Sequence, residues 1–150
     1  MTVTVNIQDL PDLVGHELGV SSWLTVDQAR IDAFADITRD HSAIHVDPEY
    51  AAASPWGTTL AHGLLTLSLG ASFLTEVLNV IGYSGGLSLG YDRVRFTAPV
   101  PVGSRLRMRV GLKSVEERPD GWEIRFTETI EAEGGEDPVC VAERISRYFR

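Results

Sequence analysis

The sequence predicts a single α+β domain in which a long antiparallel sheet wraps around one buried helix. Two observations lead to this prediction. Residues 60–80 are apolar at nearly every position, which is typical of a helix enclosed by other structure. From Gly85 onward, apolar and polar residues alternate with the period of two that half-buried strands show. The 150 residues have the length of one domain, and no repeat or linker divides them.

A strand and a helix are predicted ahead of the long apolar segment. Residues 22–26 have the composition of a short strand. Asp27 is the predicted N-cap of a helix whose apolar residues fall mainly on one face. We expect that helix to end near Thr38, and residues 39–46 to form a loop.

Local signals also mark the next two helices. Residues 47–49 have the order Asp, Pro, Glu, which places a cap, a proline at the first helical position and an acidic residue in the first turn. A short helix through Ala53 is therefore predicted. Thr58 or Thr59 is the predicted cap of the long apolar helix, which should end before Gly82.

Long strands are predicted for the second half. The first runs from Leu87 to Phe96 with a break in its alternation near Asp92. The turn signal Pro119-Asp120-Gly121 predicts a hairpin. The remaining strands are expected at residues 106–112, 122–130 and 139–148.

Composition excludes several classes of partner. The net charge of −8 argues against binding to nucleic acid or an anionic membrane, which relies on Lys and Arg. The amino-terminal residues lack the features of a signal peptide, and His62 and Glu76 interrupt the apolar segment, so no membrane span is expected. We therefore expect a cytoplasmic protein. The single cysteine, Cys140, lies in an apolar run and is predicted to be a packed thiol.

Three of the four histidines, His41, His45 and His62, fall close together beside Asp40 and Asp47. They could form a metal site, but the segment has no cysteine and none of the standard ligand spacings, so no metal is expected. Alternatively, Asp40 and His45 could be an acid–base pair that holds a water, takes its proton and returns a proton elsewhere. A turn cap at Asp40 and a buried, hydrogen-bonded His45 are the structural alternative. Spacing alone does not decide between them.

The dipeptide His62-Gly63 stands where the long helix is expected to open. A ligand atom can closely approach the backbone N–H of a glycine, and helix N-termini favour negative charge. An oxyanion hole for a carbonyl oxygen needs this geometry. The alternatives are that Gly63 only permits close helix–sheet packing and that His62 only makes a hydrogen bond near the helix start.

Two motifs become recognisable together: residues 40–48, DHSAIHVDP, and residues 57–65, GTTLAHGLL. They resemble the hydratase motif of the MaoC-like (R)-specific enoyl-CoA hydratases, also called 3-hydroxyacyl-thioester dehydratases, a family that includes the nodulation protein N group. The resemblance continues through YDRVRF at 91–96 and PVPVGS at 99–104, and covers residues 20–148.

The resemblance implies a hot-dog fold for residues 1–150, assembled as a homodimer. It also implies a hydro-lyase that reversibly adds water to trans-2-enoyl thioesters of coenzyme A, or of an acyl-carrier protein, to give (R)-3-hydroxyacyl thioesters. Asp40 would be the main base on the water, and His45 would position it and share the proton transfer. The backbone N–H of Gly63, with His62 beside it, would bind the thioester carbonyl. No cofactor is implied.

The chain also departs from the family. Ser42-Ala43 stands where the family often has Asn-Pro, which changes the expected rigidity and polar support of Asp40, and Ala71 stands where some hydratases have a helix serine. Arg93 and Arg95 are the candidates for binding coenzyme A phosphates, since arginine binds phosphate bidentately. Two other functions stay open: a hot-dog acyl-CoA thioesterase and a non-catalytic module that binds acyl thioesters.

Overall fold

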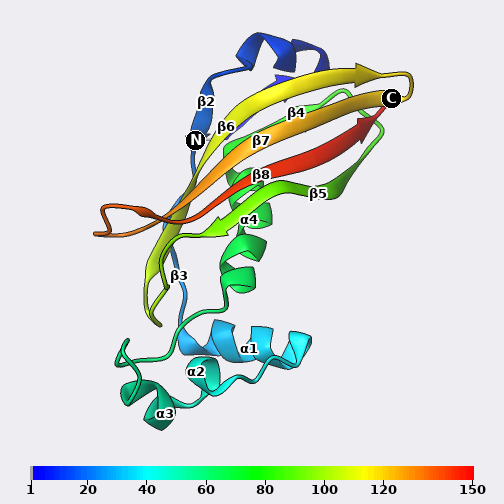
Figure 1. Ribbon diagram of the computed structural model, residues 1–150. Coiled ribbons are helices and arrows are strands. Elements are labelled where there is room, and N and C mark those ends of the chain that lie inside the picture. The colour runs from blue at the N-terminus through cyan, green and yellow to red at the C-terminus, as the bar shows by residue number, and fades with distance from the viewer. Residues whose placement is uncertain (1) are drawn as a thin grey trace.

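A computed structural model describes residues 2–150 of the chain, in which an antiparallel sheet curves around helix α4 (Gly63–Val77) (Figure 1). Within these residues the sheet has six strands, ordered β2-β6-β7-β8-β5, with β3 also paired to β6. The strands are β2 (Glu17–Val20), β3 (Leu24–Thr25), β5 (Gly85–Phe96), β6 (Arg105–Arg118), β7 (Gly121–Ala132) and β8 (Pro138–Phe149). The predicted α+β hot-dog architecture is confirmed.

The predicted hairpin joins β6 to β7, with Arg118 paired to Gly121 across the turn. Gly121 is required there because an added Cβ would lie 1.9 Å from the carbonyl oxygen of Tyr148 on β8. The predicted break in β5 is also present, as register shifts between Ser88 and Gly90 and between Tyr91 and Arg93. These bulges decide which β5 side chains face α4.

Three helices lie together at the amino-terminal end of α4: α1 (Gln28–Thr38), α2 (Ala43–Val46) and α3 (Pro48–Ala52) (Figure 1). Asp27 caps α1 by accepting a hydrogen bond from the N–H of Arg30, as predicted. Asp47 likewise caps α3 through two backbone N–H groups. The segment predicted as a loop between them contains α2, which is a single turn that carries no strong helix signal of its own.

Helix α4 is shorter at both ends than the predicted span of residues 60–80. Its N-cap residue is His62, and neither predicted threonine caps it; Thr59 instead donates to Gln28. At the other end the chain leaves the helix to form β4 (Leu78–Ile81), which pairs in parallel with β1 (Val3–Asn6). An unbroken apolar run does not show where a buried helix becomes a buried strand.

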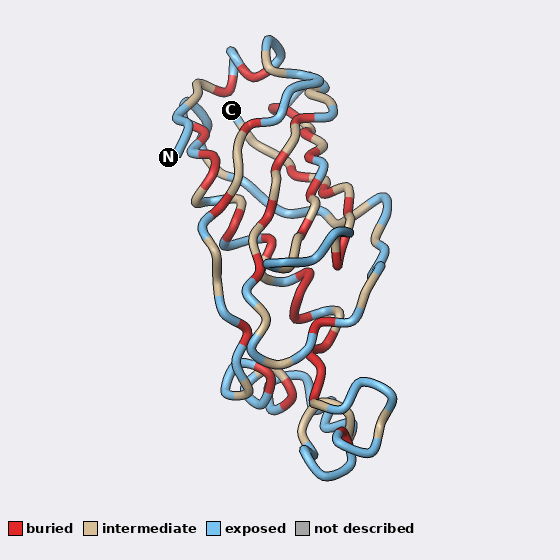
Figure 2. Tube along the Cα trace, turned by 90° about the vertical axis from the view of Figure 1, so that its left-hand side faces the viewer, coloured by how far each residue is buried: buried red, intermediate tan, exposed pale blue. Residues whose placement is uncertain are grey.

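The core lies between α4 and the inner face of the sheet, and the buried residues follow both elements (Figure 2). A 3-10 helix, η1 (Ile7–Leu13), closes one end with the buried Ile7 and Leu10. The prediction that other structure covers α4 on all sides is wrong for this chain by itself, because one face of the helix is exposed, with Leu64 60% accessible. No helix in residues 2–150 is long and apolar enough to cross a membrane.

Candidate active site

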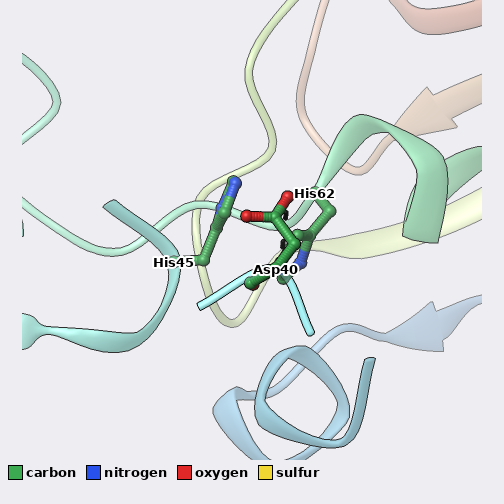
Figure 3. A group of neighbouring side chains, drawn as sticks. All are labelled: Asp40, His45 and His62. Carbon is green, nitrogen blue, oxygen red and sulfur yellow. Dashed lines mark hydrogen bonds and ion pairs between the residues drawn. The ribbon is translucent and has the colours of Figure 1, made fainter. Parts of the chain in front are cut away.

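Asp40, His45 and His62 come from three separate segments and meet beside the amino terminus of α4 (Figure 3). Asp40 follows α1, His45 lies in α2, and His62 directly precedes α4. Arg39 ends α1 with a left-handed φ of 62°, which turns the chain toward His62. One nitrogen or oxygen from each of the three side chains lies within 4.8 Å of the others. The predicted pair is therefore brought together, with a third residue against it.

The carboxylate of Asp40 is held from one side by Ser42. Its Oδ1 accepts a hydrogen bond from the Ser42 hydroxyl at 2.5 Å and from the Ser42 N–H at 3.3 Å. These two donors hold the pKa of Asp40 below its usual value, the hydroxyl having the larger effect. The side chain is 51% exposed. Asp40 is thus an ionised, accessible carboxylate, and Ser42 supplies the polar support that the sequence left open.

The hydrogen bond of His45 fixes which ring nitrogen is free. Its Nδ1 lies 2.7 Å from the carbonyl oxygen of Leu60. Because a carbonyl can only accept, Nδ1 carries the proton, and in the neutral ring Nε2 is left as an acceptor. The backbone of α2 is anchored as well, since the Gln28 side chain donates to the carbonyl oxygen of His45 at 2.8 Å. Gln28 lies outside both motifs, and the motif that contains Leu60 does not show that its carbonyl faces His45.

His62 lies behind the pair, and its predicted role in substrate binding is not supported. The residue is only 3% exposed. Its Nε2 lies 3.0 Å from the backbone oxygen of Asp40, and its ring stacks on that of His45 with centroids 3.8 Å apart. Phe34 packs on it at 5.0 Å. A ring enclosed in this way positions Asp40 and His45 and has no face free for a substrate.

The same three residues have the composition of a metal site, but their geometry fits an acid–base pair better. The lone pairs of imidazole lie in the ring plane, and the rings of His45 and His62 stack at 26° instead of converging on one point. His45 Nδ1 and His62 Nε2 are also occupied by backbone carbonyls. These contacts leave the Asp40 carboxylate and Nε2 of His45 free, while Nδ1 of His62 has no partner but is buried.

Gly63 opens α4 next to a cavity. Its N–H belongs to the first helical turn, where no carbonyl of the same helix can accept it. A cavity of about 320 Å³ lies against it; the lining residues are Ala61, Gly63, Thr66, 96–100 and Val139. The ring of Phe96 packs so closely that a Cβ on Gly63 would lie 2.9 Å from its Cδ2. A side chain at this position would therefore require the Phe96 ring to move.

Arg93 and Arg95 are not brought to this site. Their strand partners across β5 and β8 are Glu143 and Val141. The intervening Val94 pairs with Ala142, which faces α4, so the two arginines project from the opposite, outer face of the sheet. The predicted contact with coenzyme A phosphates therefore has no support within this chain, because the bulge beside Asp92 sets their direction.

Comparisons with known proteins identify the family to which the chain belongs. The family model described as MaoC like domain matches residues 9–132. The 3-hydroxyacyl-thioester dehydratase Z of Mycobacterium tuberculosis (strain ATCC 25618 / H37Rv) is 44% identical over 144 residues, covering 95% of each chain. Nodulation protein N of Rhizobium leguminosarum bv. viciae is 43% identical over 153 residues, covering 95% of this chain and 90% of that one.

A solved structure shows the same fold. The (R)-hydratase from A. caviae involved in PHA biosynthesis superposes with a TM-score of 0.73 at 26% identity. The match covers 89% of this chain and 94% of that chain. The two chains therefore share the fold over most of their length.

Proposed function

Because the chain belongs to the MaoC-like domain family, whose named relatives are dehydratases and hydratases, we propose that it adds water reversibly to trans-2-enoyl thioesters to give (R)-3-hydroxyacyl thioesters. One observation carries this proposal: an ionised Asp40 carboxylate and the free Nε2 of His45 lie together at the start of α4, beside the N–H of Gly63. That arrangement provides a base, a second water ligand and a carbonyl donor.

In the hydration direction, a water molecule is held between Asp40 and His45. Asp40 takes a proton from it as the water oxygen attacks C3 of the enoyl chain. The electron pair of the C2=C3 bond moves toward the thioester carbonyl, and C2 receives a proton from the pair. One C–O bond and one C–H bond form, one C=C π bond breaks, and the two residues finish in their starting protonation states.

The N–H of Gly63 stabilises the charge that develops on the thioester carbonyl oxygen. This N–H points out of the first turn of α4, where the helix dipole also favours negative charge. Donors aimed at a developing oxyanion contribute strongly in acyl chemistry because they need not reorganise during the reaction. The acyl carrier in this proposal is coenzyme A or an acyl-carrier protein, as the relatives' thioester chemistry implies.

We also propose that the active form is a homodimer. The sheet ends at β5, an edge strand whose apolar side chains Leu87 and Leu89 are 59% and 54% exposed. The uncovered face of α4 contributes Leu64, at 60% exposed. Edge strands with exposed apolar residues pair readily with another chain. Light scattering after gel filtration should give twice the chain mass.

The proposed reaction is tested by following the absorbance of the conjugated double bond of crotonyl-CoA and longer enoyl-CoA thioesters. We expect the wild type to consume them and to form the (R) product on chiral analysis. His45→Gln should lower kcat/KM by ~10²–10⁴-fold. A wild type no faster than this variant at every chain length would overturn the proposal.

A thiol reagent in the same assay separates the alternatives. A hydratase consumes the double bond without releasing coenzyme A, whereas a thioesterase releases the thiol. A binding module would give a calorimetric signal with acyl-CoA and no turnover. Release of free thiol at the rate of substrate loss would favour the thioesterase over the hydro-lyase.

A further inference from the structure

One residue that lines the cavity beside Gly63 has a buried hydroxyl group without a partner. Thr66 lies one turn into α4 and is 1% exposed. Its Oγ1 has no hydrogen-bond partner anywhere in residues 2–150. Thr66 lines the 320 Å³ cavity together with Gly63 and Phe96. Buried hydroxyls in native proteins are nearly always hydrogen-bonded, so this one calls for an explanation.

Three other helical hydroxyls, those of Thr38, Ser68 and Thr75, bond to carbonyl oxygens of their own helices. Thr38 donates to the carbonyl oxygen of Phe34 at 2.7 Å. On α4 itself, Ser68 donates to Leu64 at 2.7 Å and Thr75 to Ser72 at 2.8 Å. This local bond is the usual way for a helical Ser or Thr to be satisfied. Thr66 does not make it, although it is the most deeply buried of the four.

The Thr66 hydroxyl is therefore costly to folding unless a ligand satisfies it. Burying a hydroxyl without a partner destabilises the folded state, and valine would fill the same space without that cost. A cavity of this size next to the hydroxyl leaves room for a polar ligand atom. The ligand atom expected in this cavity is the one that Gly63 binds.

The direction of the Thr66 side chain supports the same ligand position. Side chains of an α-helix lean toward its amino terminus and lie over the preceding turn. Thr66 is three residues after Gly63, so it covers the turn that Gly63 begins. Gly63, whose N–H no helical carbonyl accepts, and Thr66 thus line one cavity within a single turn.

We propose that the Thr66 hydroxyl is a second donor to the thioester carbonyl oxygen, forming a two-donor oxyanion hole with the N–H of Gly63. This inference rests on the proposed hydratase function. As water adds to C3 and the π electrons move toward the carbonyl, both donors stabilise the enolate oxygen. Thr66 keeps its proton throughout; the proton that C2 receives comes from the Asp40–His45 pair.

Substitutions at Thr66 separate the hydroxyl from side-chain size. Thr66→Val and Thr66→Ala remove the donor, and Thr66→Ser retains it. We expect kcat to fall by ~10²–10³-fold in the first two and to stay close to wild type in the serine variant, the loss typical of one oxyanion donor. KM should change little. Thr66→Val should melt no lower than wild type, because an unsatisfied hydroxyl is gone.

A purely structural role predicts the opposite order, with the isosteric valine fully active and the smaller serine and alanine impaired. That order, or a wild-type kcat in Thr66→Val, would overturn the inference. If the valine variant does not fold, alanine against serine decides: an active alanine variant contradicts the inference, and an inactive one beside an active serine supports it. Ser68→Ala is the matched control, since its hydroxyl is already satisfied by Leu64.

The outcome for the proposed function is read separately. If the wild type hydrates no enoyl thioester, the hydratase function itself fails. If the wild type and Thr66→Val hydrate equally well, the hydratase function stands and only the second donor is lost.

Discussion

Two clusters of a carboxylate with a basic side chain lie along the same helix, and their surroundings differ. At the start of α4, Asp40 is half exposed, and Ser42 donates to one side of its carboxylate. Two turns further on, Glu128 from β7 is paired with Arg144 from β8 beneath Gly70, and both side chains are buried. Hydrogen-bond donors lower the pKa of Asp40, whereas burial raises that of Glu128 despite the attraction of Arg144.

The difference shows what each carboxylate can do. Asp40 is charged, accessible and free to accept a proton from water. Glu128 lies 3.0 Å from where a Cβ on Gly70 would be, so the helix backbone closes over it. Arg144 is further enclosed by the ring of Tyr91, 5.2 Å away. We therefore assign the first cluster to chemistry and the second to holding α4 on the sheet.

The largest expected effects come from replacing the two carboxylates. One variant should lose activity and the other should lose stability. Asp40→Asn should lower kcat/KM by ~10²–10⁴-fold and leave the melting temperature unchanged, because only the base is lost. Glu128→Gln should leave kcat/KM within a few-fold but cost about 3–5 kcal/mol of unfolding free energy, because Arg144 becomes a buried unpaired charge. Denaturant titration and the hydration assay measure both. An inactive but fully stable Glu128→Gln protein would reverse the assignment.

Replacing both members of the buried pair sharpens this result. In the double variant Glu128→Leu with Arg144→Met, no charge is left unpaired, and most of the lost stability should return. Unfolding free energies of the two single variants and the double variant test this. If the double variant is no more stable than the singles, the pair has a role beyond charge neutralisation.

A smaller effect is expected at His62, which supports the catalytic pair from behind. His62→Phe keeps a ring stacked on His45 but removes the hydrogen bond to the backbone of Asp40. We expect kcat to fall about tenfold, the worth of one neutral hydrogen bond in positioning. Steady-state kinetics on an enoyl thioester measures it. A loss as large as that of His45→Gln would instead place His62 among the reacting groups.

Removing the support of Ser42 should change the pH dependence rather than the maximum rate. With Asp40 as the proposed base, activity should be lost as pH falls through its pKa, which the Ser42 hydroxyl holds low. Ser42→Ala raises that pKa, and the acidic limb of kcat/KM should move to higher pH. The two profiles should converge at alkaline pH. An unchanged acidic limb would show that another group controls it.

The last prediction concerns Cys140, whose thiol should not be alkylated in the folded protein. This thiol is buried in the sheet, and burial raises its pKa to about 11. Iodoacetamide at mildly alkaline pH should leave the folded protein unlabelled and label it fully in denaturant. Rapid labelling of the folded protein would show that the inner face of the sheet opens.

Local signals in the sequence predicted the parts of the fold that local chemistry decides. The caps at Asp27 and Asp47 and the hairpin before Gly121 appear where expected. The ends of α4 were predicted wrongly, because an apolar run is compatible with either helix or strand until its neighbours are known. The strands β1 and β2 were not predicted for a similar reason, as each is only four residues long.

The candidate site was predictable as a set of residues but not as an arrangement. Asp40, His45 and Gly63 were found from their motifs, and the structure gathers them beside α4. Which nitrogen of His45 is free depends on the carbonyl of Leu60, fifteen residues away, and a sequence motif does not show where a backbone carbonyl points. Glu128 did carry a signal: it shares a strand face with the buried Phe126 and Ile130.

The most direct test of the central claim is the fate of the oxygen atom of water. Hydration in oxygen-18 water should place the label on C3 of the hydroxyacyl thioester, with coenzyme A still attached, and Asp40→Asn should abolish this incorporation. Label found instead in the carboxylate of a released acid would contradict the account, because the water would then have attacked the thioester carbonyl.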